Sequence, residues 1–98
     1  MLIVLAKATA KDGMVENIVN NAETLIEATR AEDGCIDYNL HNSTEDDNIL
    51  VFVEKWESEE FLKSHLNQPH FIEFGSAIED LLAKDLEISV YSSEEIDL

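Results

Sequence analysis

The stretch Ile49-Leu50-Val51-Phe52-Val53-Glu54-Lys55-Trp56 decides the fold. It opens on an unbroken apolar run, which predicts a strand that is covered on both faces and is therefore central in a sheet. Because side chains alternate along a strand, one face carries Leu50, Phe52, Glu54 and Trp56, and the other carries Ile49, Val51, Val53 and Lys55. A carboxylate is costly to bury unless it is paired or protonated, so Glu54 is a candidate functional residue.

A helix is predicted directly after this strand. Ser58 is a favoured N-cap residue, and the acidic residues that follow it suit the positive end of the helix dipole. Helical spacing gives an inward-facing stripe of Phe61, Leu62, His65 and Leu66. Pro69 predicts the first turn of a second helix, whose apolar face carries Phe71, Phe74, Ile78, Leu81 and Leu82. The first of these helices returns His65 towards the strand that carries Glu54 and Trp56.

The remaining segments complete an α+β pattern. Leu2–Ala10 and Asp85–Tyr91 read as strands, and a helix between Gly13 and Gly34 buries Val15, Ile18, Val19, Ala22, Leu25, Ile26 and Thr29. Gly34 stands where a left-handed residue ends a helix. Cys35–His41 alternates strictly, with Cys35, Asp37, Asn39 and His41 on one side and Ile36, Tyr38 and Leu40 on the other. This order predicts a ferredoxin-like βαββαβ sandwich with a four-stranded antiparallel sheet.

The predicted sheet has an uncovered apolar face, because its helices lie on one side only. Ile49, Val51 and Val53 lie on that face, and a second copy of the chain is the simplest cover for it. The sequence therefore predicts a homodimer that packs sheet against sheet. Residues 1–91 form the predicted domain, and residues 92–98 form an acidic tail.

Composition excludes several classes of function. The chain has 98 residues and a formal charge of −16, which argues against binding to nucleic acids or to anionic membranes. Cys35 is the only cysteine, so no disulfide can form within the chain. The apolar start lacks a basic region, and we interpret it as a strand and not as a signal peptide, so the expected location is the cytoplasm.

The candidate polar groups each allow two interpretations. Glu54 is either a structural partner of Lys7 or Arg30, or an acid or base that also orients a histidine. His65 is either a satisfied core histidine or a proton acceptor, and His70 is either a helix cap or a binding residue. No metal site is predicted, because His65 and His70 lack the i, i+4 spacing of helical zinc motifs. Without a glycine-rich loop, no nucleotide or flavin cofactor is predicted either.

Aromatic residues surround these polar groups. Phe52, Trp56, Phe61, Phe71 and Phe74 either fill the core or form the walls of an apolar pocket, and Tyr38 can add a hydroxyl from the neighbouring strand. Alternation lets only one of Tyr38 and Asn39 face that pocket. Such a pocket suits a small planar organic ligand.

Three motifs resemble the antibiotic biosynthesis monooxygenase (ABM) family. They are Glu32-Asp33-Gly34-Cys35-Ile36-Asp37-Tyr38, then Glu54-Lys55-Trp56-Glu57-Ser58-Glu59-Glu60-Phe61 with His65, and last His70-Phe71. The resemblance extends from Met1 to about Tyr91 and implies a dimeric α+β barrel with a pocket in each subunit. Gly75 stands where the haem-degrading branch has its histidine ligand, so haem degradation is not expected.

The resemblance implies a cofactor-independent monooxygenase that oxidises a small quinol or phenol with O2. In this interpretation His65 takes the proton of the substrate hydroxyl, and Glu54 orients His65 or tunes its pKa. Trp56 completes the catalytic set, and the substrate-binding residues are Tyr38, Phe52, Phe61, His70, Phe71 and Phe74. Two alternatives stay open: a non-catalytic dimer that binds or senses a small ligand, and an isomerase of a small carbonyl compound.

Overall fold

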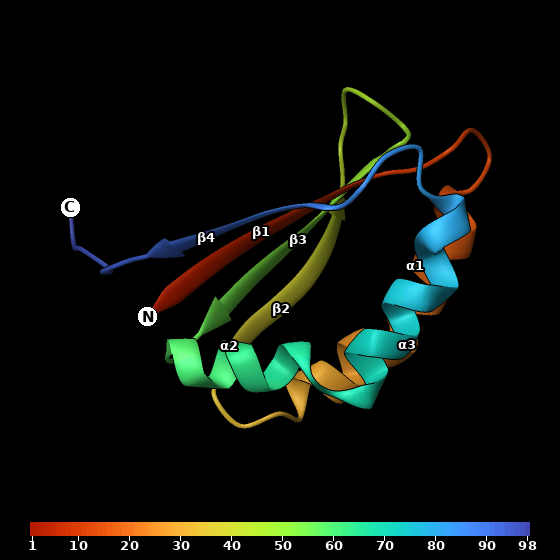
Figure 1. The fold of residues 1–98 in the computed structure, drawn as a ribbon. Helices are drawn as coiled ribbons and strands as arrows, with labels where there is room; N and C mark the ends of the chain where they lie inside the picture. The colour runs from red at the N-terminus through yellow and green to blue at the C-terminus, as the bar shows by residue number, and fades with distance from the viewer.

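The structure is a computed structural model that describes residues 1–98 (Figure 1). Its elements, in chain order, are β1 (Leu2–Thr9), α1 (Val15–Arg30), β2 (Cys35–Asn42), β3 (Ile49–Trp56), α2 (Glu59–Leu66), α3 (Pro69–Ile78), the 3₁₀ turn η1 (Glu79–Leu81) and β4 (Glu87–Ser92). The strands form one antiparallel sheet in the order β2-β3-β1-β4. The predicted ferredoxin-like α+β arrangement is confirmed.

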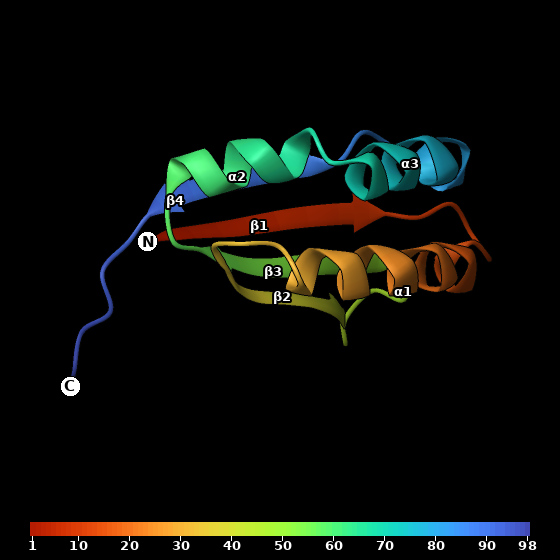
Figure 2. The same cartoon turned by 90° about the horizontal axis from the view of Figure 1, so that it is seen from below.

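All helices lie on one side of the sheet (Figures 1 and 2). Helices α1 and α3 lie beside each other, and α2 runs on from α3 along the same layer. None of them is long and apolar enough to cross a membrane. The opposite face of the sheet is left without a covering layer.

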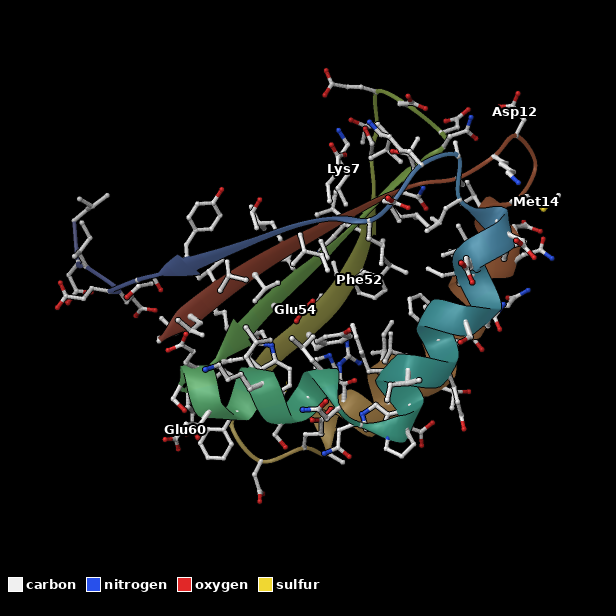
Figure 3. All side chains as sticks on the ribbon, viewed as in Figure 1. Lys7, Asp12, Met14, Phe52, Glu54 and Glu60 are labelled. Atoms are coloured by element: carbon white, nitrogen blue, oxygen red, sulfur yellow. The ribbon has the colours of Figure 1, made fainter.

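Strand β3 has the predicted central place and the predicted faces. Leu50, Phe52, Glu54 and Trp56 are all at most 5% exposed, and the alternate residues are half-buried. Figure 3 shows Phe52 and Glu54 directed towards the helices. Lys7 of β1 pairs in register with Val51 and lies on the other face. The carboxyl of Glu54 is therefore inside the core layer.

Strand β2 differs from the predicted strict alternation. Cys35 pairs with Trp56 but Asp37 pairs with Lys55, so the register shifts between them and Ile36 is the extra residue. This β-bulge places Cys35 and Tyr38 on the same side of the sheet, although their spacing in a regular strand would separate them. Ile36 is 47% exposed as a result. The predicted grouping of Cys35 with Asp37 is therefore wrong.

The helices depart from their predictions at three places. Helix α3 ends at Ile78, so Leu81 lies in η1 and Leu82 follows it in an extended conformation, and neither belongs to the predicted helix. Leu66 lies on the predicted inward side of α2 but is 43% exposed, so Leu62 and His65 are the buried residues of α2. Helix α1 has Ala31 as its C-cap, and the left-handed residue Gly34, with φ of +80°, lies in the turn that leads into β2. The ring of Phe61 packs over Gly34 so closely that a Cβ atom there would overlap it.

Strand β4 begins at Glu87, two positions later than predicted, and forms an edge of the sheet. Ile88 pairs with Ala6 and Val90 pairs with Val4, which places both side chains on the helix side. They are nevertheless 50% and 49% exposed, because the helix layer does not cover this edge. The space between sheet and helices therefore opens beside β4.

Candidate active site

A cavity of about 90 Å³ lies between the sheet, all four strands of which contribute to its lining, and helices α2 and α3. Most of its lining is apolar, and its polar side chains are Tyr38, Glu54 and His65. The half-exposed Ile88 and Val90 also line it. The cavity therefore joins a closed polar end, where Glu54 and His65 are buried, to the open edge of the sheet.

Six of the predicted site residues line this cavity. They are Tyr38, Phe52, Glu54, His65, Phe71 and Phe74. The other three lie outside it: Trp56 is fully buried behind Glu54, Phe61 covers Gly34, and His70 contacts Glu32. The sequence also did not predict the contribution of β4 or of the glycine at position 75, which line the cavity as well.

Glu54 is buried without a cationic partner. Its Oε1 atom accepts a hydrogen bond of 3.0 Å from Nε1 of Trp56, and no ion pair with Lys7 or Arg30 forms. Burial raises the pKa of the Glu54 carboxyl to about 7, the Trp56 hydrogen bond opposes this rise, and the charge of Glu32 adds to it. A carboxyl with this pKa can give or take a proton near neutral pH.

His65 is held by Glu32 and not by Glu54. Its Nδ1 lies 2.7 Å from Oε2 of Glu32, so the predicted orientation of His65 by Glu54 is wrong. A carboxylate can only accept a hydrogen bond, so Nδ1 carries the hydrogen. Nε2 is buried and has no hydrogen-bond partner. Burial lowers the pKa of His65, against the opposing effect of Glu32, which favours a neutral ring whose Nε2 has a free lone pair.

Glu32 is the residue that sequence reasoning missed. It comes from the turn between α1 and β2, and its Oε2 also lies 2.7 Å from Nε2 of His70. The signal was present, because Glu32 opens the first of the ABM-like motifs. The contacts of Glu32 with His65 and His70 could not be predicted from the sequence, because only the tertiary fold brings this turn against α2 and α3.

Tyr38, and not Asn39, faces the cavity. Arg30 donates one hydrogen bond to the Tyr38 carbonyl oxygen at 3.0 Å and another to Oδ1 of Asn39 at 2.9 Å, which turns Asn39 away. Burial and the neighbouring carboxylates raise the pKa of Tyr38 well above its usual value, so the phenol keeps its hydrogen. The pKa of Cys35 is likewise raised, to about 11, by burial and by Glu32, which leaves this thiol neutral.

Glu32, His65 and His70 are also the group whose donor atoms could hold a metal ion. One oxygen and two ring nitrogens lie within 4.8 Å of one another. The spacing of His65 and His70 excludes a helical zinc motif, but Glu32 supplies a third donor from another segment of the chain.

A larger groove of about 640 Å³ lies elsewhere, between α1 and β2. It is wide open and lined by Glu23, Glu27 and Arg30 among others. It contains neither His65 nor Glu54, so the smaller cavity is the better candidate for chemistry.

Known proteins resemble the chain over most of its length. The family model described as antibiotic biosynthesis monooxygenase matches residues 1–77. "Putative monooxygenase YcnE" of Bacillus subtilis is 30% identical over 90% of this chain and 93% of its own. The Synechocystis protein sll1783 is 34% identical over 96% of this chain, which spans 64% of that relative's length.

A solved structure shares the fold over most of its length. A conserved protein from Methanosarcina mazei Go1 superposes with a TM-score of 0.91 at 34% identity, covering 95% of this chain and 92% of its own. The match thus includes the strands and helices that surround the cavity. The chain belongs to the antibiotic biosynthesis monooxygenase (ABM) family.

Proposed function

We propose that this chain is a cofactor-independent monooxygenase that oxidises a small phenol or quinol with O2. The observation that carries the proposal is the buried, unpartnered Nε2 of His65 in a residue that lines an otherwise apolar cavity. The name of the Bacillus relative, which calls it a monooxygenase, supports the same reaction class. An apolar cavity with a few polar groups suits an aromatic ring that carries a hydroxyl.

In the proposed first step, Nε2 of His65 accepts the proton of the substrate hydroxyl. The resulting phenolate is electron-rich and donates electrons to O2, and one oxygen atom forms a bond to a ring carbon that carries hydrogen. The O–O bond then breaks, and the second oxygen leaves as water with that hydrogen and the hydroxyl proton. A phenol and O2 thus give a quinone and water, with no further reductant required.

Glu32 and Glu54 have different roles in this proposal. Glu32 holds Nδ1 of His65 and stabilises the imidazolium that forms when Nε2 is protonated. Glu54, whose pKa is about 7, gives its proton to the departing oxygen and takes up in its place the proton that leaves the ring carbon, so it is unchanged after each turnover. Trp56 positions the Glu54 carboxyl from behind. The neutral hydroxyl of Tyr38 is available as a hydrogen-bond donor to the substrate oxygen.

The size of the cavity limits the substrate. About 90 Å³ is less than the roughly 150 Å³ of a protein cavity known to bind benzene, so even a single ring must displace side chains of the wall or extend towards the open edge. A larger substrate would extend past Ile88 and Val90 at the open edge. We therefore favour one-ring phenols and hydroquinones over polycyclic ones.

We also propose a homodimer that forms through the uncovered sheet face. Ile3, Leu5 and Tyr91 lie side by side across β1 and β4, beside Val51 and Val53 of β3. Leu5 is 39% and Tyr91 is 53% exposed in the single chain. Burial of this apolar surface would stabilise the pair of sheets.

Incubation with one-ring phenols and hydroquinones under ¹⁸O₂ tests the reaction. The proposal expects one labelled oxygen atom in the quinone product and the other in water. Product formation at the same rate without O2 would identify an isomerase instead. Ligand retained in native mass spectrometry without any O2 consumption would identify a binding or sensing protein.

A further inference from the structure

We propose that Glu32, His65 and His70 form a binding site for a divalent transition-metal ion of the Zn²⁺ class. The three side chains come from the turn before β2, from α2 and from α3, and they converge on one point. Both histidine nitrogens lie 2.7 Å from the same oxygen, Oε2 of Glu32. No other group of three His, Cys, Asp or Glu side chains in the chain converges in this way, and the function proposed above does not require His70.

The donor atoms select the class of metal. Two imidazole nitrogens and one carboxylate oxygen are typical of Zn²⁺, Co²⁺ and Ni²⁺ sites. Mg²⁺ and Ca²⁺ prefer oxygen donors alone, which the many surface carboxylates of this acidic chain also offer. A preference for Zn²⁺ over Mg²⁺ therefore separates this site from general attraction to negative charge.

The site needs only a small rearrangement to accept an ion. Zn²⁺ lies about 2.0–2.2 Å from nitrogen and oxygen ligands, which in a tetrahedral site places neighbouring ligand atoms roughly 3.4 Å apart. The present separations are those of hydrogen bonds, so each ring nitrogen must move away from Glu32 by roughly 0.7 Å. His65 is buried, whereas the side chains of Glu32 and His70 are 12% and 19% exposed, so the ion can enter on the side of His70.

Metal binding would change the chemistry of the cavity. In the metal-free protein Nδ1 of His65 carries the hydrogen and faces Glu32, which leaves Nε2 as an acceptor. An ion bound at Nδ1 forces the hydrogen of the neutral ring onto Nε2. The cavity then contains a donor where it had an acceptor. This consequence rests on the proposed function, in which Nε2 is the base, and predicts that the ion inhibits turnover.

Calorimetric titration with Zn²⁺ tests the site without any substrate. Tag-free protein, stripped of metal with EDTA and dialysed, is titrated in excess Mg²⁺ as wild type, His70→Gln and His41→Gln. Glutamine at position 70 keeps an N–H donor for Glu32 but removes the imidazole ligand. His41, on β2, is an exposed histidine away from the cluster and serves as the matched control.

The expected result is one saturable Zn²⁺ site per chain in wild type and His41→Gln, and at least a tenfold weaker affinity in His70→Gln. Imidazole ¹⁵N spectra should show Nε2 of His65 change from a bare to a protonated nitrogen when Zn²⁺ is added. Absence of a saturable site in wild type, or equal affinity in wild type and His70→Gln, would overturn the proposal. Because both readouts need no substrate, they are independent of whether the monooxygenase assignment holds.

Discussion

Nδ1 of His65 lies 2.7 Å from Oε2 of Glu32, although the two residues are 33 positions apart in the sequence. This contact joins the turn between α1 and β2 to helix α2. It also fixes the hydrogen on Nδ1 and leaves Nε2 free in a residue that lines the cavity. Glu32 therefore decides which nitrogen of His65 can accept a proton.

Glu32→Ala should destabilise the fold, because it leaves the buried N–H of His65 without an acceptor. A buried donor that loses its partner costs about 1–3 kcal/mol of the free energy of unfolding. Urea denaturation at pH 7 measures this, with Glu23→Ala, an exposed position on α1, as the control that should change by less than about 0.5 kcal/mol. Equal stability of the two variants would mean that the Glu32 contact is not maintained in solution.

Glu54→Gln should change how stability depends on pH. The pKa of Glu54 is raised from 4.5 to about 7 in the folded state, so folding favours the protonated carboxyl. The wild type therefore loses stability relative to Glu54→Gln as pH rises from about 4.5 to 7, by up to about 3 kcal/mol. Above about pH 7 the difference in the free energy of unfolding between wild type and Glu54→Gln should stay constant.

Denaturation of both proteins at several pH values between 5 and 8 measures this difference. Glutamine keeps an oxygen that can accept the Trp56 hydrogen bond, so the substitution changes the charge with little change of shape. A difference in stability that does not vary with pH would contradict a buried, easily protonated Glu54.

The close packing of Phe61 on Gly34 gives a further prediction. Gly34 and Gly13 both have a left-handed backbone, with φ of +80° and +79°. A Cβ at Gly13 meets open space, whereas a Cβ at Gly34 overlaps the Phe61 ring. Gly13→Ala should therefore cost about 1 kcal/mol, and Gly34→Ala about 1–3 kcal/mol more, in the free energy of unfolding. In a Phe61→Ala background the cost of Gly34→Ala should fall to about that of Gly13→Ala, and an unchanged cost in that background would contradict this packing.

Much of this fold could be predicted from the sequence, because the residue patterns that mark its strands and helices are local. The apolar run of β3 and the helical spacing of α1 predict those elements, and Pro69 marks the start of α3 as predicted. The β-bulge at Ile36 was not accessible, because it depends on how β2 pairs with β3. Because of this bulge, the regular alternation of side chains in a strand predicts the wrong face of the sheet for Cys35.

Part of the candidate site could also be predicted from local sequence patterns. Residues on the inner face of β3 and on the inward side of α2 and α3 were predicted to meet, and Glu54 and His65 do line one cavity. The partner of His65 was not predictable from spacing, because Glu32 approaches it through the tertiary fold. The open edge at Ile88 and Val90 depends on how far the helix layer extends.

Val53→Asp should separate the proposed dimer. Val53 is half-buried on the uncovered face, beside Leu5 of β1, and a charge there would have to be desolvated between the two sheets. Ile72→Asp, at a 56% exposed position on α3, is the control on the other side of the molecule. Sedimentation analysis should find wild type and Ile72→Asp as dimers and Val53→Asp as a monomer. A monomeric wild type would contradict the proposed interface.

The rate of O2 consumption with one-ring hydroquinones, measured in the presence of EDTA, tests the role of His65 most directly. Wild type is compared with His65→Gln, which lacks the free ring nitrogen, and with His41→Gln as the matched control. We predict that His65→Gln is slower by at least about 100-fold, the usual contribution of a general base, while His41→Gln equals wild type. Equal rates in wild type and His65→Gln would contradict the account.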